Sequence, residues 1–224
     1  MNDRLWNILV DSFPKLLGYG VTVTIPLTLC SFALALLIAV IVALIQYANV
    51  KILRQLCRFY IWITRGTPLL VQLYLVFFGF PSLGVYLDAF PAAVLVLGLN
   101  EGAYMAETVR GALESVSRGQ MEAGYCVGMN YIQIMAHVVL PQAFRTAFPA
   151  MGNSMIAMLK ETSMAATITV MEMFRQAQVI NGRVYEPLAL YGEAALIYLI
   201  FCTLLSWLQR LGEKRLNVYG GSRT

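Results

Sequence analysis

The residues best suited to chemistry in this chain are charged and amide side chains inside long apolar stretches. They include Arg65, Asn100, Glu101 and Glu161. Ionisable groups in a bilayer core cost about 2.5 to 3.5 kcal/mol each on insertion scales, so they face a protein interior or a cavity. A guanidinium binds a carboxylate through two parallel hydrogen bonds, and a carboxylate accepts from an ammonium group. Such a set is suited to a zwitterionic molecule such as a free amino acid.

Helical spacing places polar side chains on one face of each of three predicted helices. These faces are Arg65, Leu69 and Gln72; Asn100, Tyr104 and Glu107; and Ser154 with Glu161. We therefore predict a substrate-binding set that consists of Arg65, Gln72, Asn100, Tyr104 and Glu161. In this set Arg65 binds the α-carboxylate, Glu161 binds the α-ammonium group and Asn100 adds hydrogen bonds. The alternative is an ion pair from Arg65 to Glu161 or Glu101 that only holds helices together.

The elements that must position these residues are membrane spans. The chain has 224 residues, of which 59% are hydrophobic and 12% charged, whereas a soluble domain is about 25% charged. Five stretches approach the ~20 apolar residues that cross a bilayer: 21–45, 59–80, 90–109, 148–170 and 188–208. We predict an all-α membrane protein with one transmembrane domain over residues 1–224. Five spans cannot form two equal inverted halves.

Basic residues predict the orientation of the spans. They gather after the first span, after the third span and in the tail: Lys51, Arg54 and Arg58; Arg110, Arg118 and Arg145; Arg210, Lys214, Arg215 and Arg223. The positive-inside rule then places the N-terminus outside and the C-terminus in the cytoplasm. The net charge of +4 is a topology signal, and nothing favours nucleic acid as a partner. Residues 1–18 have amphipathic helical spacing, which predicts a helix in the outer interface.

A polar segment at 111–147 interrupts the predicted spans. Its recognisable residues are, in order, Glu122-Ala123-Gly124, Gly128 and Leu140-Pro141. We expect short helices over 120–127 and 131–139, joined near Gly128, where glycine permits a positive φ or a close helix approach. Proline at 141 is expected to end the second helix. The spacing of Gly124 and Gly128 also matches a helix-pairing motif of membrane helices, but the segment is too polar to lie in lipid.

This segment resembles the loop of bacterial ABC importer permeases that contacts the ATPase. Further stretches resemble polar amino-acid uptake permeases: Arg65-Gly66-Thr67-Pro68-Leu69-Leu70-Val71-Gln72, Leu99-Asn100, Ala103-Tyr104-Met105-Ala106-Glu107 and Leu159-Lys160-Glu161-Thr162-Ser163. The resemblance covers about 58–180. It departs from the family at Gly124, where alanine is usual, and at Glu161, where aspartate is more frequent.

The resemblance implies a type I ABC importer permease fold and a cytoplasmic coupling loop. The residues implied to couple to the ATPase are Glu122, Ala123, Gly124, Gly128, Leu140 and Pro141. The implied partners are a dimer of ATPase subunits, a second permease subunit that is identical or homologous, an extracytoplasmic amino-acid-binding protein and membrane lipid. The implied location is the bacterial inner membrane. ATP binding and hydrolysis would drive alternating access to a path for polar amino acids.

The chain itself has no nucleotide-binding loop, because it contains no Gly-x-x-x-x-Gly-Lys-Ser/Thr motif and no Gly-Lys pair. ATP and Mg²⁺ are therefore expected on the partner, with no cofactor, metal or catalytic residue in this chain. The four cysteines include no close pair, and His137 is the only histidine. The competing interpretation is a stand-alone secondary carrier or channel with Glu101 and Glu161 as a proton relay; a membrane enzyme lacks any nucleophile and base. The excess of acids in the predicted spans favours neutral or cationic substrates.

Overall fold

The computed structural model describes residues 3–48 and 50–218, and within these ranges the chain is helical with no strand. The elements in chain order are α1 (Asp3–Tyr19), π-helical η1 (Gly20–Thr24), α2 (Ile25–Tyr47), α3 (Lys51–Gly66), α4 (Leu69–Tyr74), π-helical η2 (Leu75–Gly79), 3₁₀ segment η3 (Phe80–Leu83), α5 (Ala89–Glu114), α6 (Arg118–Cys126), α7 (Tyr131–Ile134), π-helical η4 (Met135–Val139), α8 (Leu140–Glu161), 3₁₀ segment η5 (Thr162–Ile168), α9 (Met173–Val184) and α10 (Pro187–Val218).

Within the described ranges, three helices are long and apolar enough to cross a membrane: Asp3–Tyr47, Ala89–Glu114 and Pro187–Leu216. The pair Lys51–Gly66 and Leu69–Leu83 forms a fourth if it is one broken span. The remaining long helix, α8, packs between α5 and α10 but carries Arg145, Lys160 and Glu161. The expected all-α membrane fold is confirmed.

The first span is longer than we expected. α1, η1 and α2 join into one helix of 45 residues, about 67 Å at 1.5 Å per residue. A separate helix was expected over 1–18; its described part, 3–18, is joined to the first span without a turn. Because a hydrocarbon core is only about 30 Å thick, this helix is long enough to reach well beyond one face. Its α1 part packs against α9 and α10.

The second and fourth spans differ from their expected bounds. Instead of one helix over 59–80, the chain turns by 104° between α3 and the segment that follows. Proline favours an extended conformation in the residue before it, and Thr67 has φ −122° and ψ 143° before Pro68. The expected fourth span at 148–170 begins earlier, at Leu140, and its helix gives way to η5 at Thr162.

The centre of the bundle is the pair α2 and α5, which make the most extensive contact in the fold. Two glycines of α5 allow this approach. A Cβ at Gly98 would lie 2.7 Å from Leu34 Cδ2, and one at Gly102 would lie 3.0 Å from Ile38 Cγ2. The spacing Gly98-x-x-x-Gly102 is the small-residue pattern of membrane helix pairs, and we had not predicted a helix contact from it.

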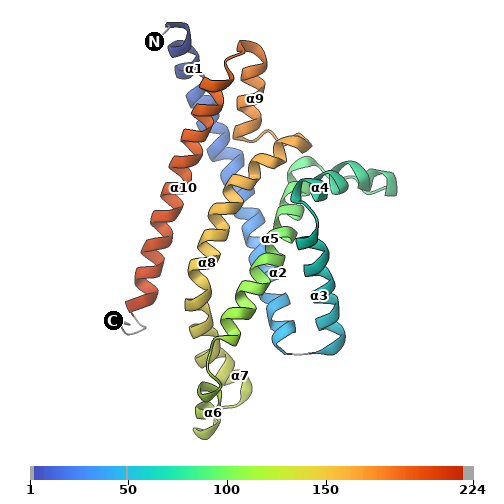
Figure 1. The fold of residues 1–224 in the computed structure, drawn as a ribbon, viewed down its shortest axis with the longest axis vertical. Helices are drawn as coiled ribbons and strands as arrows, with labels where there is room; N and C mark the ends of the chain where they lie inside the picture. Colours follow the sequence, from blue (N-terminus) through green and yellow to red (C-terminus); the bar gives the residue numbers. More distant parts are fainter. Residues whose placement is uncertain (1–2, 49, 219–224) are drawn as a thin grey trace.

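Buried polar contacts fix α9 and α10 to the first span. Glu172 is fully buried and accepts the backbone N–H groups of Phe174 and Arg175 at the start of α9. It also accepts the Tyr198 hydroxyl of α10 at 2.8 Å. Ser12 of α1 donates to Glu193 of α10. These contacts lie at the end opposite to α6 and α7 (Figure 1). One end of the bundle therefore holds the buried carboxylates Glu172 and Glu193, and the other end carries the loop helices.

Candidate functional site

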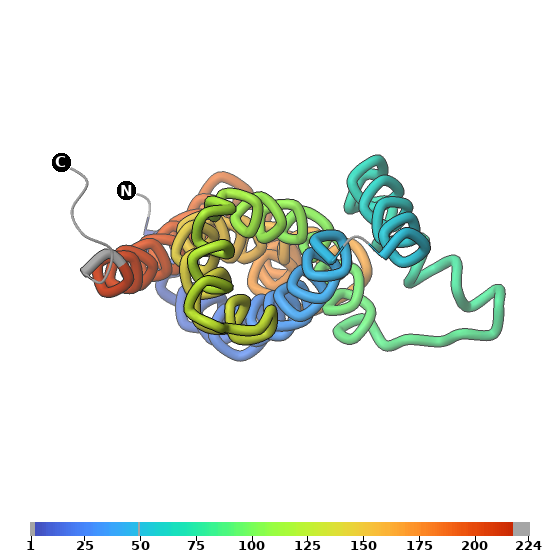
Figure 2. Tube along the Cα trace, turned by 90° about the horizontal axis from the view of Figure 1, so that it is seen from below, coloured from blue at the N-terminus to red at the C-terminus, as the bar shows by residue number. Residues whose placement is uncertain are grey.

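The loop at 111–147 folds into a compact unit at one end of the bundle. α6 and α7 lie beyond the lower ends of α2, α5 and α8 in Figure 1, and Figure 2 shows them across that end of the bundle. Residues 115–117 join α6 to α5, and η4 joins α7 to α8. The loop also touches α2, because the Tyr47 hydroxyl lies 3.7 Å from Met121 Sδ. A force on this unit therefore acts directly on two long helices.

Gly128 ends α6 in a left-handed conformation with φ +82°. Its N–H donates to the Tyr125 carbonyl at 3.0 Å, and the Met129 N–H donates to the Gly124 carbonyl at 3.0 Å. This pair of bonds is the Schellman motif, which satisfies the last carbonyls of a helix. No atom lies within 4 Å of a Cβ built at Gly128. Of the two reasons for glycine that the sequence left open, the backbone angle applies here and close helix approach does not.

Gly124 has the other role that glycine can play, which is close packing. A Cβ at this position would lie 2.7 Å from Ile134 Cγ1, and Ile134 is fully buried. Gly124 therefore lets α6 pack directly onto α7. The departure from the usual alanine at this position fits the bulk of Ile134, which lies against it.

The second helix of the loop does not end at Pro141. Asn130 and Gln133 form a reciprocal capping box at the start of α7, with both bonds at 2.9 Å. The chain then continues through η4 into α8, where Pro141 occupies the first turn. Our expectation of a break was wrong: a π-helical turn, in which the Leu140 N–H donates to the Met135 carbonyl, precedes Pro141, and the helix continues past it. The helical path from α7 to α8 is therefore continuous.

The outer surface of the loop is apolar for a surface segment. Val127 is 75% exposed and Ile132 is 77% exposed, and Tyr125 and Tyr131 are also exposed. Glu122, Ala123, Leu140 and Pro141 of the predicted coupling set are exposed as well, whereas Gly124 is buried. Desolvation, with the neighbouring Tyr47 and Tyr125, raises the pKa of the Tyr131 hydroxyl, so it remains a neutral hydrogen-bonding group.

The predicted substrate-binding residues fall into two contacting pairs and a separate carboxylate. Arg65 ends α3 and lies over the Tyr104 ring of α5, with 4.9 Å from Cζ to the ring centroid. A guanidinium over an aromatic face is attracted by the quadrupole of the ring. Arg65 and Gln72 were expected on one helix face, which is wrong because the bend at Pro68 lies between them.

Gln72 and Asn100 form the second pair and stabilise that bend. The Gln72 side-chain amide donates to the Thr64 carbonyl at 2.8 Å and to the Thr67 carbonyl at 3.1 Å. Asn100 Nδ2 of α5 donates to Gln72 Oε1 at 3.1 Å. Asn100 is only 7% exposed. These two amides therefore tie the bent span to α5, a structural role that the sequence did not predict.

Glu161 ends α8. Glu101 of α5 lies near Ser154 and Glu161 of α8. Among the described residues, Arg65 forms no ion pair with Glu161 or Glu101; the ion pairs there involve Arg4 and Arg110. The alternative of a static Arg65 pair therefore finds no support in this conformation.

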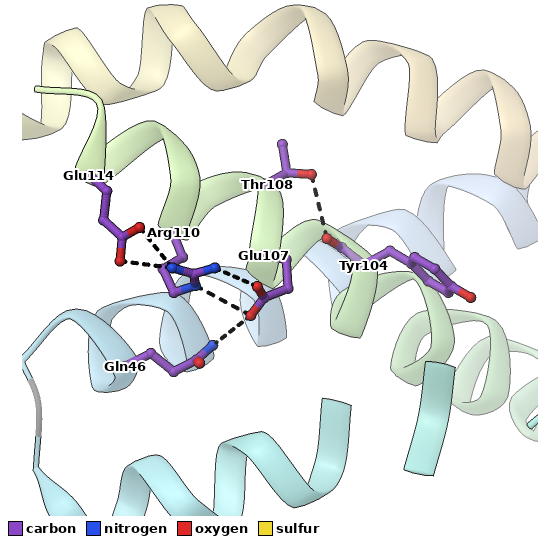
Figure 3. A network of polar contacts seen from close by, with 6 residues as sticks. All are labelled: Gln46, Tyr104, Glu107, Thr108, Arg110 and Glu114. Atoms are coloured by element: carbon purple, nitrogen blue, oxygen red, sulfur yellow. Dashed lines mark hydrogen bonds and ion pairs between the residues drawn. The ribbon is translucent and has the colours of Figure 1, made fainter. Parts of the chain in front are cut away.

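A polar network links α2 to the C-terminal half of α5 (Figure 3). Arg110 binds Glu107 at 2.7 Å and both oxygens of Glu114 at 2.8 Å. Gln46 of α2 donates to Glu107 at 3.2 Å. The i, i+3 and i, i+4 spacing of Arg110 to two glutamates predicts such pairs, and this signal was missed because Arg110 was taken only as a mark of topology. The network strengthens the part of α5 that leads into the loop.

Within the described ranges, no group of three or more His, Cys, Asp or Glu residues is placed to hold a metal ion.

Known proteins match this chain over nearly its whole length. Residues 35–218 match the family described as binding-protein-dependent transport system inner membrane component. The L-cystine transport system permease protein TcyB of Bacillus subtilis is 45% identical over 215 residues, which cover 96% of this chain and 92% of that protein. The L-cystine permease TcyL of the same organism is 37% identical and covers 94% of this chain and 91% of its own length.

Solved structures agree with these relatives. The crystal structure of an amino acid ABC transporter with histidines has a TM-score of 0.85 and 34% identity, and covers 92% of this chain and 96% of that chain. The fold is that of type I ABC importer permeases, and the resemblance seen in the sequence is confirmed. This chain belongs to the family of binding-protein-dependent transport system inner membrane components and is an amino-acid ABC transporter permease.

Proposed function

We propose that this chain is the transmembrane subunit of an ATP-driven importer for polar amino acids. An extracytoplasmic binding protein delivers the substrate, and a pair of ATPase subunits carrying ATP and Mg²⁺ drives alternating access. A second permease subunit, identical or homologous, completes the path. The complex lies in the bacterial inner membrane, with the N-terminus of this chain outside and the C-terminus in the cytoplasm.

The observation that supports coupling is the construction of the loop. Its exposed apolar residues include Val127 and Ile132, and an exposed apolar patch marks an interaction site. The patch is held firmly by the Gly128 cap and by the contact of Gly124 with Ile134. α5 and α8 leave this unit directly. Movement of a docked ATPase would therefore move both helices, which carry Asn100, Tyr104 and Glu161.

The substrate to test first is L-cystine, because two relatives at 45% and 37% identity are named as L-cystine permeases. Each half of L-cystine carries an α-carboxylate and an α-ammonium group. Arg65 is suited to the carboxylate and Glu161 to the ammonium group. Gln72, Asn100 and Tyr104 would contribute by holding Arg65 and the bend of the second span in place.

Transport assays in proteoliposomes test this function. The chain is reconstituted with its ATPase, and the binding protein is added outside with labelled L-cystine and other polar amino acids. Uptake should require ATP on the ATPase side and the binding protein on the other side. Uptake by the chain alone, driven by a proton gradient without ATP, would instead establish the secondary carrier. Uptake of another amino acid in place of L-cystine would correct the substrate and leave the importer intact.

A further inference from the structure

A charged cleft of about 340 Å³ lies between α2, α3 and α5, outside the predicted coupling surface. Its lining includes Arg54, Arg58, Arg65 and Trp62 of α3, and Glu107 and Arg110 of α5. Its α5 residues lie in the last part of that helix, toward the end of the bundle that carries the loop at 111–147, and α3 stands at the edge of the molecule (Figures 1 and 2). The positive-inside rule assigns this end to the cytoplasm.

The cleft has an excess of positive charge. Four arginines line it against two carboxylates, Glu107 and Glu114, and both carboxylates are bound to Arg110. Among the described residues, Arg58 and Arg65 have no carboxylate within 4 Å; Glu107 acts on Arg65 only at longer range. Arg54, Arg58 and Arg65 follow a spacing of four and seven residues and therefore share one face of α3. Cations held together in this way are stabilised by an anion.

The shape and borders of the cleft point to a phosphate group. Guanidinium groups bind phosphate oxygens through paired hydrogen bonds. Trp62, which lines the cleft, is 70% exposed, and tryptophan prefers the headgroup level of a membrane. Next to it on α3 lie further exposed apolar side chains that include Ile52, Leu56 and Phe59. A basic cleft bordered by an apolar helix surface is the arrangement that holds a lipid headgroup with its chains alongside.

We propose that this arginine cleft is a binding site for a phosphate group, and that the headgroup of an anionic phospholipid supplies it. The lipid would bridge α3 to α5 beside the network of Arg110. The proposal rests on the cleft alone and does not require the proposed transport function.

Thermal unfolding of the purified full-length chain in a neutral detergent tests the site. Short-chain phosphatidylglycerol should raise the unfolding midpoint more than diacylglycerol with the same acyl chains, which lacks the phosphate. Arg58→Gln should weaken the apparent lipid affinity about fivefold, since one arginine near an anionic headgroup contributes about that factor. Arg210→Gln is the matched control, because it removes an exposed arginine from α10 near the same end. Arg58→Lys should retain part of the affinity.

Two further measurements, with inorganic phosphate and with L-cystine, identify the source of the ligand. Inorganic phosphate, added at constant ionic strength without lipid, should leave the midpoint unchanged. A rise that depends on Arg58 would overturn the lipid and assign the site to a soluble phosphate. A rise with L-cystine that depends on Arg58 would assign the cleft to the substrate path instead. The phosphate site itself is wrong if phosphatidylglycerol and diacylglycerol act alike, or if Arg58→Gln and Arg210→Gln weaken the lipid effect equally.

Discussion

At the scale of single residues, some polar side chains of the bundle are hydrogen-bonded to other parts of the protein, whereas others keep hydrogen-bond donors available. Gln72 donates to the Thr64 carbonyl near the end of α3 and accepts from Asn100, so the hydrogen-bonding groups of Gln72 are largely occupied. Arg65 has an aromatic neighbour in Tyr104 and no ion pair among the described residues. Its guanidinium donors are therefore the ones available to an incoming carboxylate, which makes Arg65 the sharper test of the predicted set.

We predict that Arg65→Lys impairs uptake by about tenfold or more although it keeps the charge. A single ammonium group cannot reproduce the paired donors of guanidinium, and losing one charge-assisted hydrogen bond costs about 1.5 to 3 kcal/mol. Glu161→Gln should impair uptake while the complex assembles and retains basal ATP hydrolysis. The control is Lys160→Arg, which keeps the charge at an exposed position beside Glu161. Recovery of uptake when Arg65 and Glu161 are both neutralised would show a structural pair and contradict the assignment.

A second prediction at this scale concerns Gly128. A side chain there must adopt φ +82°, which costs about 1 to 2 kcal/mol for an L-residue and more for a β-branched one. Gly128→Val should therefore disturb the end of α6 and lower substrate-stimulated ATP hydrolysis and uptake several-fold, with the protein still in the membrane. Gly119→Ala lies in the same helix at an ordinary helical position with its nearest neighbour 3.8 Å away, and should behave like the parent. Equal coupling in Gly128→Val and the parent would remove this cap from the mechanism.

At the scale of elements, the glycine face of α5 decides how closely the two central helices approach. Gly102→Leu places atoms against Ile38 Cγ2 and the Ala35 carbonyl, 3.0 and 3.3 Å from the new Cβ. Overpacking of this kind costs about 1 to 3 kcal/mol, so the unfolding midpoint of the purified chain should fall. Gly111→Leu is the matched control in the same helix, because no atom lies within 4 Å of its Cβ. A similar midpoint for both variants would show that α2 and α5 adjust without cost.

The continuous path from α7 through η4 to α8 also belongs to this scale. A π-helical segment adds a residue per turn to the helix and often occurs at functional positions. Here it precedes Pro141 and lets the helix pass a proline that would otherwise interrupt it. The loop is therefore mechanically joined to α8 by a helix, and to α5 by only three residues, 115–117.

At the scale of the whole molecule, the topology can be tested with a native residue. Cys126 lies exposed in the loop at 111–147, so a membrane-impermeant thiol reagent should label it only after the membrane is permeabilised if this loop is cytoplasmic. A cysteine introduced at Asp88, in a Cys126→Ser background, should react in intact cells. Cys57 is buried and serves as an internal reference for unreactive thiols. Labelling in the opposite order would reverse the orientation given by the basic residues and with it the location of the loop.

The sequence by itself determined the class of this protein. Apolar length and low charge predicted a helical membrane protein, and the motif from Glu122 to Pro141, with the stretches around Arg65, Asn100 and Glu161, identified the family. These features are local: a span is a run of apolar residues, and a positive φ at Gly128 follows from one glycine at a helix end. Properties of this kind need no knowledge of which segments lie side by side.

Only the tertiary structure decided which neighbours the polar residues have. We expected one continuous helix through Thr67-Pro68. The chain instead bends there by 104°, and this bend separates Arg65 from Gln72. The contacts of Gly98 and Gly102 with Leu34 and Ile38, and the arginine cleft between α2, α3 and α5, join segments far apart in the chain. Spacing along a helix specifies which side chains share a face, but the neighbour across that face is set by the packing of the whole bundle.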